Sequence, residues 1–246
     1  MAAQRIIITG GTSGIGRAAA LGFAAAGWQV AICGRRAEKL AETKQAGGLA
    51  VAEVADVADP EAVARFFDRA VAGLGGVDVV FNNAGAFAPA TSFGDIEIAT
   101  WRKMVDINLN GAFYVAREAF RAMRTQSPQG GRIINNGSIS AHAPRPGAAS
   151  YTATKHAITG LTKAISLDGR AFNIACGQID IGNTATDMTS GMSSGSLQAD
   201  GSMKPEPTFD VRHVVESLLY MAGLPLGANV QFMTVMATAM PYIGRG

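Results

Sequence analysis

The chain has 246 residues, of which 48% are hydrophobic, and it carries a formal net charge of +2 at pH 7. This length suits one α/β domain with a large core, and the apolar content excludes general disorder. Lysines and arginines are scattered, which argues against a nucleic acid partner, because such binding depends on clustered positive charge. The two cysteines, Cys33 and Cys176, lie in apolar runs. They are too few for a disulfide framework or a four-ligand zinc site, and we expect no metal.

The first residues, Met1 to Arg5, show neither the basic nor the apolar region of a signal peptide. No apolar stretch approaches the roughly 18 residues that a membrane-spanning helix needs. We therefore expect a cytoplasmic protein that makes no membrane contact.

Short, β-branched apolar runs alternate with longer segments of helical spacing along the whole chain. The expected strands are residues 5–9, 29–33, 49–54, 78–82, 132–136, 172–176 and 230–235. The expected helices are residues 15–26, 37–45, 60–72, 100–126, 150–170 and 210–221. Nearly continuous apolar strands are typical of parallel sheets that helices cover on both faces. The pattern predicts an α/β fold, a Rossmann-like doubly wound parallel sheet of about seven strands, as a single domain over residues 1–246.

One segment, residues 184–209, departs from this alternation because it is rich in Ser, Gly, Met and Pro and has few regular apolar positions. A loop of this length in a compact domain is commonly a lid or a binding loop. We expect it to close over a substrate, and the alternative is a surface insertion without a role.

A glycine-rich turn separates the first expected strand from the first expected helix. Glycines permit a tight turn and let backbone N–H groups approach a pyrophosphate, while the helix amino terminus adds partial positive charge. The spacing is G-x-x-x-G-x-G, not the G-x-G-x-x-G of the general dinucleotide fingerprint. We expect this turn to bind the cofactor through Gly10, Thr12, Ser13, Gly14, Ile15 and Gly16.

Two arginines, Arg35 and Arg36, follow the second expected strand, where dinucleotide sites contact the adenosine ribose. An acidic residue there would repel a 2′-phosphate, whereas an arginine attracts it. No acidic residue follows this strand until Glu38. We therefore expect NADP(H) rather than NAD(H), with Arg35 as the first candidate and Arg36 as the second. The alternative is that both are solvated surface charges.

Further cofactor contacts are expected where the third and fourth strands end. Asp56, next to Val57, can accept a hydrogen bond from the adenine amino group. Ligands of doubly wound sheets bind at the carboxyl ends of the strands, and small residues there let a cofactor lie against the sheet edge. The fourth strand is followed by such residues, Asn83, Ala84 and Gly85.

Tyr151 and Lys155 form the sharpest chemical pattern in the chain. Residues four apart share one face of a helix. A phenol has a pKa of about 10, and a nearby ammonium lowers the pKa and so promotes proton exchange. Ser138, thirteen positions earlier at the end of the fifth expected strand, can hydrogen-bond a reacting oxygen. Asn108 lies in the long expected helix 100–126 and can fix Lys155 through its carbonyl or a water molecule.

Together these motifs resemble the signature of the short-chain dehydrogenase/reductase family, over about residues 5–177. The resemblance implies hydride transfer between a nicotinamide cofactor and a carbonyl or alcohol, with no metal. It also implies Asn108, Ser138, Tyr151 and Lys155 as the catalytic set, Tyr151 and Lys155 also touching the cofactor. Members are commonly homo-oligomers, dimers or homotetramers, that pair through the long helices, here 100–126 and 150–170.

The chain departs from the family pattern after the sixth expected strand. The family usually shows Pro-Gly and then a Thr near the nicotinamide amide. Here Gly177 and Ile179 fit as cofactor contacts, but the proline is absent and the threonine is displaced to Thr184 or Thr186.

The substrate pocket is expected to draw on residues 86–93, 139–146 and 184–209. These segments hold few charges, so we expect a neutral, fairly apolar carbonyl or alcohol as the small-molecule substrate. The candidate pocket side chains are Phe87, Phe93, His142, Met188, Met192 and Met203. Two other functions stay open at this point: a dinucleotide-binding sensor or scaffold without turnover, and an enzyme related to sugar-nucleotide epimerases or dehydratases.

Overall fold

The computed structural model describes residues 4–186 and 195–243, and these form a seven-stranded sheet in which every pairing is parallel. The strands, from one edge to the other, are β3 (Val51–Val54), β2 (Gln29–Gly34), β1 (Arg5–Thr9), β4 (Val79–Asn82), β5 (Gly131–Asn136), β6 (Ile174–Ile181) and β9 (Phe232–Val235). From β1 the strands are added toward one edge of the sheet as β2 and β3, and from β4 they are added toward the other edge. The point where the order changes lies between the adjacent strands β1 and β4. Such a switch point leaves a crevice at the carboxyl ends of the strands.

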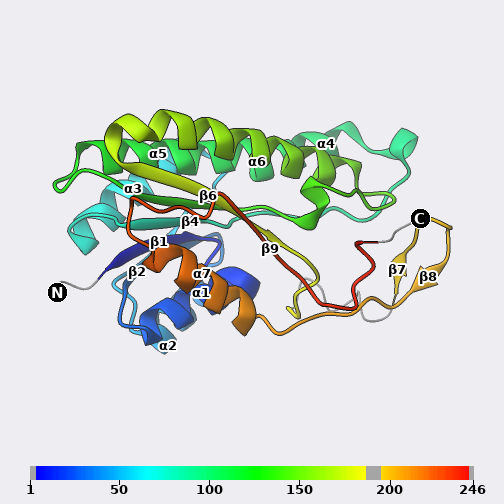
Figure 1. Cartoon of the computed structure of the whole chain (residues 1–246), viewed down its shortest axis with the longest axis horizontal. Coiled ribbons are helices and arrows are strands. Elements are labelled where there is room, and N and C mark those ends of the chain that lie inside the picture. Colours follow the sequence, from blue (N-terminus) through cyan, green and yellow to red (C-terminus); the bar gives the residue numbers. More distant parts are fainter. Residues whose placement is uncertain (1–3, 187–194, 244–246) are drawn as a thin grey trace.

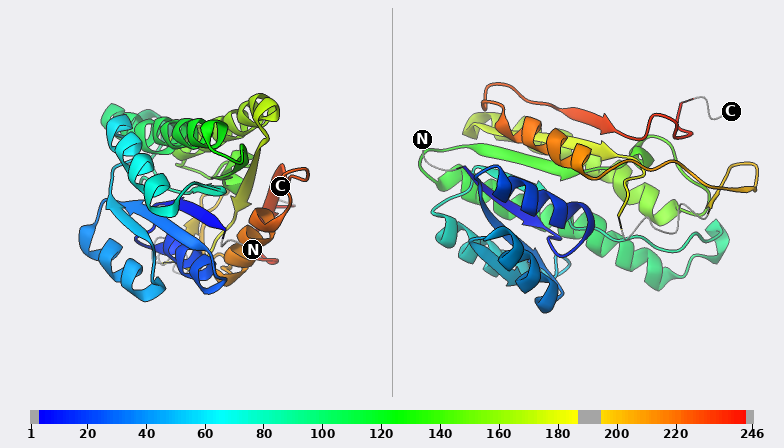
Figure 2. Two further views of the ribbon diagram at one scale, coloured as in Figure 1. Left: turned by 90° about the vertical axis from the view of Figure 1, so that its left-hand side faces the viewer. Right: turned by 90° about the horizontal axis from the view of Figure 1, so that it is seen from below.

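Helices cover both faces of the sheet (Figure 1 and Figure 2). One layer contains α1 (Gly14–Ala25), α2 (Ala37–Gly47) and α7 (Arg212–Gly223). The other contains α3 (Pro60–Leu74), α4 (Ile98–Val105), α5 (Gly111–Thr125) and α6 (Ala149–Asp168). The arrangement confirms the Rossmann-like doubly wound fold that the sequence predicts.

Strand β1 shows why the strands read as continuous apolar runs. Successive side chains of a strand point to opposite faces of the sheet. Ile6 and Ile8 pack into the core beneath α1 and α7, whereas Ile7 packs into the core that holds the phenylalanines of α3. All three isoleucines are fully buried, because each face has its own helical layer.

The long helix expected over residues 100–126 is two helices joined by a π-helical turn, η2 (Asp106–Asn110). The first of them begins at Ile98. A π turn takes one residue more than an α-helical turn and is common at functional sites. Helical spacing alone did not reveal it, because Met104, Ile107 and Val115 still read as one buried stripe.

The sixth strand was misplaced by the sequence pattern. Residues 172–176 were expected, but β6 begins at Ile174 and extends to Ile181. Phe172 instead ends the short helix η4 (Gly169–Phe172), and Asn173 follows it with a left-handed φ of 56°. The polar side chains of Gln178 and Asp180 are fully buried in β6, so they interrupted the apolar run without ending the strand.

The segment 184–209 contains a small antiparallel hairpin of β7 (Ser196–Leu197) and β8 (Met203–Lys204). The hairpin projects beyond the carboxyl ends of the sheet strands (Figure 1). Of the expected pocket residues, Met188 and Met192 lie outside the described residues. The remaining short helices are η1 (Phe93–Asp95) and η3 (Ile139–Ala141).

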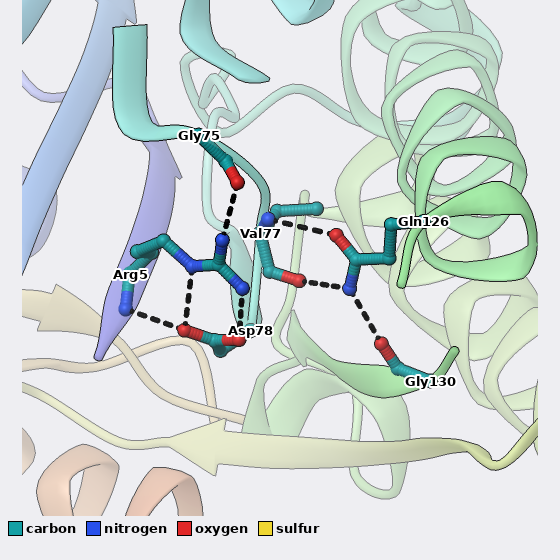
Figure 3. A network of polar contacts seen from close by, with 6 residues as sticks. All are labelled: Arg5, Gly75, Val77, Asp78, Gln126 and Gly130. Atoms are coloured by element: carbon teal, nitrogen blue, oxygen red, sulfur yellow. Dashed lines mark hydrogen bonds and ion pairs between the residues drawn. The ribbon is translucent and has the colours of Figure 1, made fainter. Parts of the chain in front are cut away.

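A polar network fastens the amino-terminal edge of the sheet (Figure 3). Arg5 donates to the Asp78 carboxylate from its backbone N–H, Nε and Nη2 over 2.7–2.9 Å. The Gln126 side chain accepts from the N–H of Val77 and donates to the carbonyls of Val77 and Gly130. These bonds tie β1, the start of β4, the end of α5 and the start of β5 together, at the end of the sheet opposite the crevice.

No helix in the described ranges is long and apolar enough to cross a membrane.

Candidate active site

A single cavity runs along the carboxyl ends of the strands and combines most of the residues that the sequence predicts. Its walls include the following predicted residues: Gly10, Thr12, Ser13, Gly14, Ile15, Gly16, Arg35, Arg36, Asp56, Val57, Asn83, Ala84, Gly85, Ser138, Tyr151 and Lys155. The cavity therefore joins the expected dinucleotide-binding turn to the expected catalytic side chains.

The glycine-rich turn has the backbone that a phosphate-binding turn needs. Gly10 and Gly14 have left-handed φ values of 72° and 51°, which favour glycine. A Cβ on Gly16 would lie 2.5 Å from Nδ2 of Asn83 and would also collide with the Gly10 carbonyl. Helix α1 starts here, and its N-cap Ser13 makes no side-chain capping bond. The first N–H groups of α1 thus remain available to an anion, as a pyrophosphate requires.

Arg36 is hydrogen-bonded to the glycine-rich turn, whereas Arg35 lies near Asp56. Nη2 of Arg36 donates to Oγ1 of Thr12 at 3.0 Å and to Oγ of Ser13 at 2.8 Å. The Arg35 side chain is 63% exposed, and its Nη1 lies 3.9 Å from a carboxylate oxygen of Asp56. Of the two candidates, Arg36 is thus the one hydrogen-bonded to the glycine-rich turn.

Amide side chains tie the carboxyl ends of neighbouring strands together. Asn83 donates from Nδ2 to the Thr9 carbonyl at 2.8 Å, and Asn136 donates to Oδ1 of Asn83 at 2.9 Å. One strand position earlier, buried Asn82 donates to Oδ1 of Asn135 at 3.0 Å. These bonds fix the floor of the cavity across β1, β4 and β5.

The start of α6 brings Tyr151 and Lys155 to the cavity beside Ser138, which follows β5. Lys155 Nζ lies 5.5 Å from the centroid of the Tyr151 ring. The same Nζ donates to the backbone carbonyl of Asn136 at 2.7 Å. Phe87 stacks on the Tyr151 ring, with the two ring centroids 3.9 Å apart.

Burial controls the pKa values of both groups. Burial raises the pKa of Tyr151 to about 12, and the negative charge of Asp180 also raises it. A hydrogen bond with Ser138 and the positive charge of Arg145 lower this pKa, but by less. Burial also lowers the pKa of Lys155 to about 8, against the influence of Asp180. The sequence led us to expect a Tyr151 pKa lowered by Lys155. The direction is the opposite, because burial disfavours the phenolate more than its neighbours favour it.

The Asn108 side chain is hydrogen-bonded to Ala86 and to Thr154. Its Oδ1 accepts from the N–H of Ala86 at 2.7 Å, and its Nδ2 donates to the carbonyl of Ala86 at 3.0 Å. Asn108 is buried in the π turn η2 and does not line the cavity. It fixes the segment after β4, and the carbonyl that holds Lys155 belongs to Asn136 instead.

The model of the short chain dehydrogenase family matches residues 4–196 of this chain. The chain belongs to the short-chain dehydrogenase/reductase family. It is 36% identical over 188 residues to a 3beta-hydroxysteroid dehydrogenase of Mediterraneibacter gnavus, covering 75% of this chain and 67% of the relative.

Two solved structures extend this likeness over nearly the full length of the dehydrogenase/reductase. Acetoin dehydrogenase YohF from Salmonella typhimurium is 30% identical, with a TM-score of 0.81 and 95% of each chain covered. A short chain dehydrogenase from Burkholderia cenocepacia in complex with NADP is 29% identical, with a TM-score of 0.79, covering 96% of this chain and 97% of that one. Family membership makes this protein an oxidoreductase.

Two predicted cofactor contacts of this dehydrogenase/reductase, Gly177 and Ile179, do not line the cavity. Gly177 and Ile179 lie inside β6, where Ile179 is fully buried in the core and Gly177 packs against the backbone of Val230. Because β6 ends only at Ile181, the residues that reach the cavity come later in the chain. These are Ile181, Gly182, Asn183, Thr184 and Thr186. The two displaced threonines thus do lie at the cavity.

Sequence reasoning missed Asp180, a fully buried residue next to the site. Its Oδ1 accepts from the backbone N–H of Ser138 at 2.9 Å and from Nε2 of Gln178 at 2.7 Å. Its Oδ2 lies 2.9 Å from Nε2 of His142. A Cβ on Gly137 would collide with Oδ1 of Asp180, so the glycine makes room for this carboxylate. An acidic residue four positions after the expected strand end at residue 176 is a weak signal, and the misplaced strand concealed it.

Phe93 is 81% exposed and lies outside the cavity, as does Met203, which is 64% exposed in β8. Within residues 4–186 and 195–243, no group of three or more His, Cys, Asp or Glu side chains could hold a metal ion.

Proposed function

We propose that this oxidoreductase is NADP(H)-dependent and transfers a hydride between the nicotinamide and a ketone or secondary alcohol, with Tyr151 as general acid and base. The observation that carries this proposal is the composition of one cavity. It holds Ser138, Tyr151 and Lys155 together with the glycine-rich turn and Arg36. The names of the relatives support the reaction type, since they include dehydrogenases of a hydroxysteroid and of acetoin.

The chain's own residues manage the substrate oxygen and its proton, while a bound nicotinamide supplies or accepts the hydride. A Tyr151 pKa of about 12 keeps the phenol protonated at neutral pH, so it can donate to a carbonyl oxygen during reduction. The Ser138 hydroxyl donates a hydrogen bond to the same oxygen and stabilises its developing charge. With a pKa of about 8, Lys155 is mostly charged at pH 7 and stabilises the phenolate that remains.

The preference for NADP(H) rests on Arg36. Its guanidinium and the hydroxyls of Thr12 and Ser13 form a cluster beside the glycine-rich turn. An arginine and hydroxyl groups suit a phosphate monoester, whereas a ribose hydroxyl alone would favour an acidic partner. The Burkholderia relative, described in complex with NADP, agrees with this choice.

The test is a fluorescence titration with NADPH and NADH, followed by a panel of ketones and aldehydes in the same cuvette. We expect tighter binding of NADPH, and its oxidation by at least one carbonyl. Binding of neither nucleotide would refute the proposal at its first step. A clear preference for NADH would refute the cofactor assignment alone, and binding without turnover would favour a dinucleotide sensor.

We also propose that the protein is a homotetramer that pairs through the layer of α4, α5 and α6. This layer exposes large apolar side chains, with Trp101 38%, Phe113 47% and Leu167 60% exposed. Light scattering after size exclusion tests the assembly, and a mass near the 25.4 kDa of one chain would contradict it.

Finally, we propose that segment 184–209 acts as a substrate lid. Its Glu206 pairs with Arg145 in the loop before α6, which brings the two segments together beside the cavity. Limited proteolysis should cut this segment more slowly when NADPH and a ketone analogue are present, and unchanged cleavage would contradict a closing role.

A further inference from the structure

Arg145 brings a charged side chain into a cavity that the sequence predicts to be apolar. It follows η3 in the loop that leads to α6, and it lines the same cavity as Ser138 and Tyr151. Its side chain is only 13% exposed. The positive charge also acts on the Tyr151 phenol, whose pKa it lowers against the larger effect of burial. Because Arg145 lines the same cavity as Ser138 and Tyr151, its guanidinium can contact the same small substrate.

The charge of Arg145 is balanced within the protein. Nη2 donates to Oε2 of Glu206 at 2.5 Å and to Oδ1 of Asn183 at 2.9 Å. The Glu206 side chain is 1% exposed and also accepts from Nδ2 of Asn183 and Nε2 of Gln198. Burial raises the Glu206 pKa, but these hydrogen bonds and the charge of Arg145 outweigh it and keep the pKa below its ordinary value. Glu206 is thus ionised, and the pair is neutral as a unit.

Among the described residues, a single nitrogen of the Arg145 guanidinium donates to protein acceptors. An arginine carries five N–H donors and no acceptor. Within the described residues, Arg145 donates from Nη2 alone, and neither Nε nor Nη1 has a hydrogen-bond partner there. A donor that stays unpaired when a substrate displaces water costs free energy. The site therefore favours a substrate that brings its own acceptor.

We propose that the substrate carries a second, uncharged oxygen acceptor besides the reacting carbonyl or hydroxyl, and that Arg145 binds this oxygen. The inference rests on the proposed function and names the substrate class of the same site. An uncharged oxygen is favoured over a carboxylate because Glu206 already neutralises the guanidinium, so an anion would face the Glu206 charge nearby. The substrate class is thus a ketone or alcohol with a neighbouring ether, hydroxyl or carbonyl oxygen.

The test compares two ketones of nearly equal shape, 1-methoxypropan-2-one and pentan-2-one, in which an oxygen replaces a methylene. NADPH oxidation gives kcat/KM for each ketone, and their ratio is measured in the wild-type protein, in Arg145→Met and in Arg65→Met. Arg65 is 62% exposed on α3, away from the cavity, and serves as the matched control. We expect the ratio to favour the ether by about tenfold or more in the wild type and Arg65→Met. The comparison between variants cancels the intrinsic reactivity of the two ketones.

In Arg145→Met the ratio should fall to near the intrinsic reactivity ratio measured with borohydride. A merely structural role for Arg145 would lower kcat/KM for both ketones equally and leave the ratio intact, which would overturn the inference. A wild-type preference for 2-oxobutanoate over both ketones would overturn it as well, because that substrate is an anion. If no carbonyl oxidises NADPH, the proposed function itself fails, and this result is distinct from an unchanged ratio. A thermal unfolding curve for each variant shows whether the fold is retained.

Discussion

The fit between Gly137 and Asp180 allows a quantitative prediction for Gly137→Ala. A Cβ at this position would lie 2.7 Å from Nε2 of Gln178, and nearer still to Oδ1 of Asp180, whereas ordinary contact begins at 3.4 Å. Both neighbours are fully buried and hydrogen-bonded, so neither can move without losing a bond. Overpacking of this kind costs about 1–3 kcal/mol. For a domain of this size the melting temperature should fall by about 2–12 °C.

The assay is thermal unfolding by circular dichroism, with kcat/KM measured on the folded protein. Activity should fall as well, because the Asp180 carboxylate holds the backbone N–H of Ser138. Gly160→Ala is the matched control: this glycine lies in α6 with no atom within 4 Å of a new Cβ. Alanine there should stabilise the helix by about 0.5–1 kcal/mol.

A double-mutant cycle identifies the cause. Asp180→Ala is itself destabilising, since it leaves the donors of Ser138 and Gln178 unpaired. In that background the cost of Gly137→Ala should shrink by at least about 1 kcal/mol, because the collision with the carboxylate is gone. An equal cost in both backgrounds, or a Gly137→Ala protein as stable as the wild type, would refute the reasoning.

Three further predictions follow from contacts elsewhere in the protein. Tyr151→Phe should unfold at the wild-type temperature yet lose activity by roughly 10²–10⁴-fold, and full activity in a steady-state assay would exclude Tyr151 as the proton donor. Arg36→Ala should raise KM for NADPH by roughly tenfold or more and change KM for NADH little; Arg35→Ala should have the smaller effect, and the reverse order would contradict the assignment. Burial alone would raise the pKa of Asp78, but the hydrogen bonds and charge of Arg5 outweigh burial and hold this pKa below its ordinary value. The ionised Asp78 therefore stabilises the fold at pH values above its unfolded-state pKa. This stabilisation is lost as the pH falls through the folded-state pKa. Asp78→Asn should therefore be less stable than the wild type in urea at pH 7, with the difference shrinking on acidification, whereas a difference independent of pH would argue against the ion pair.

The fold could be predicted from the sequence where apolar character decides the structure. The isoleucines of β1 and the glycine-rich turn after it gave the right elements, because two buried faces require a continuous apolar run. The prediction failed at β6, where Gln178 and Asp180 are buried by virtue of hydrogen bonds that no local pattern reveals. That single error displaced the expected cofactor contacts to Gly177 and Ile179 and concealed Asp180.

The candidate site was predictable for residues whose spacing carries the chemistry, such as Tyr151 and Lys155. It was not predictable for Arg145 and Glu206, which lie 61 residues apart and meet only in the folded chain. The direction of the Tyr151 pKa was also beyond the sequence, because it depends on how deeply the phenol is buried.

The π turn η2 makes the number of residues between α4 and α5 a functional quantity. Each residue of an α-helix advances the chain by about 100° around the axis. Deleting one residue between Asp106 and Asn110 would let the two helices merge into one regular α-helix. Because the π turn holds one residue more than an α-helical turn, the half that follows would keep its orientation relative to the half before it. The deletion would remove the wide turn in which Asn108 meets Ala86 and leave Met104 and Val115 on their buried faces. The extra residue therefore serves the cavity wall beside Tyr151 and not the core packing of the two helices.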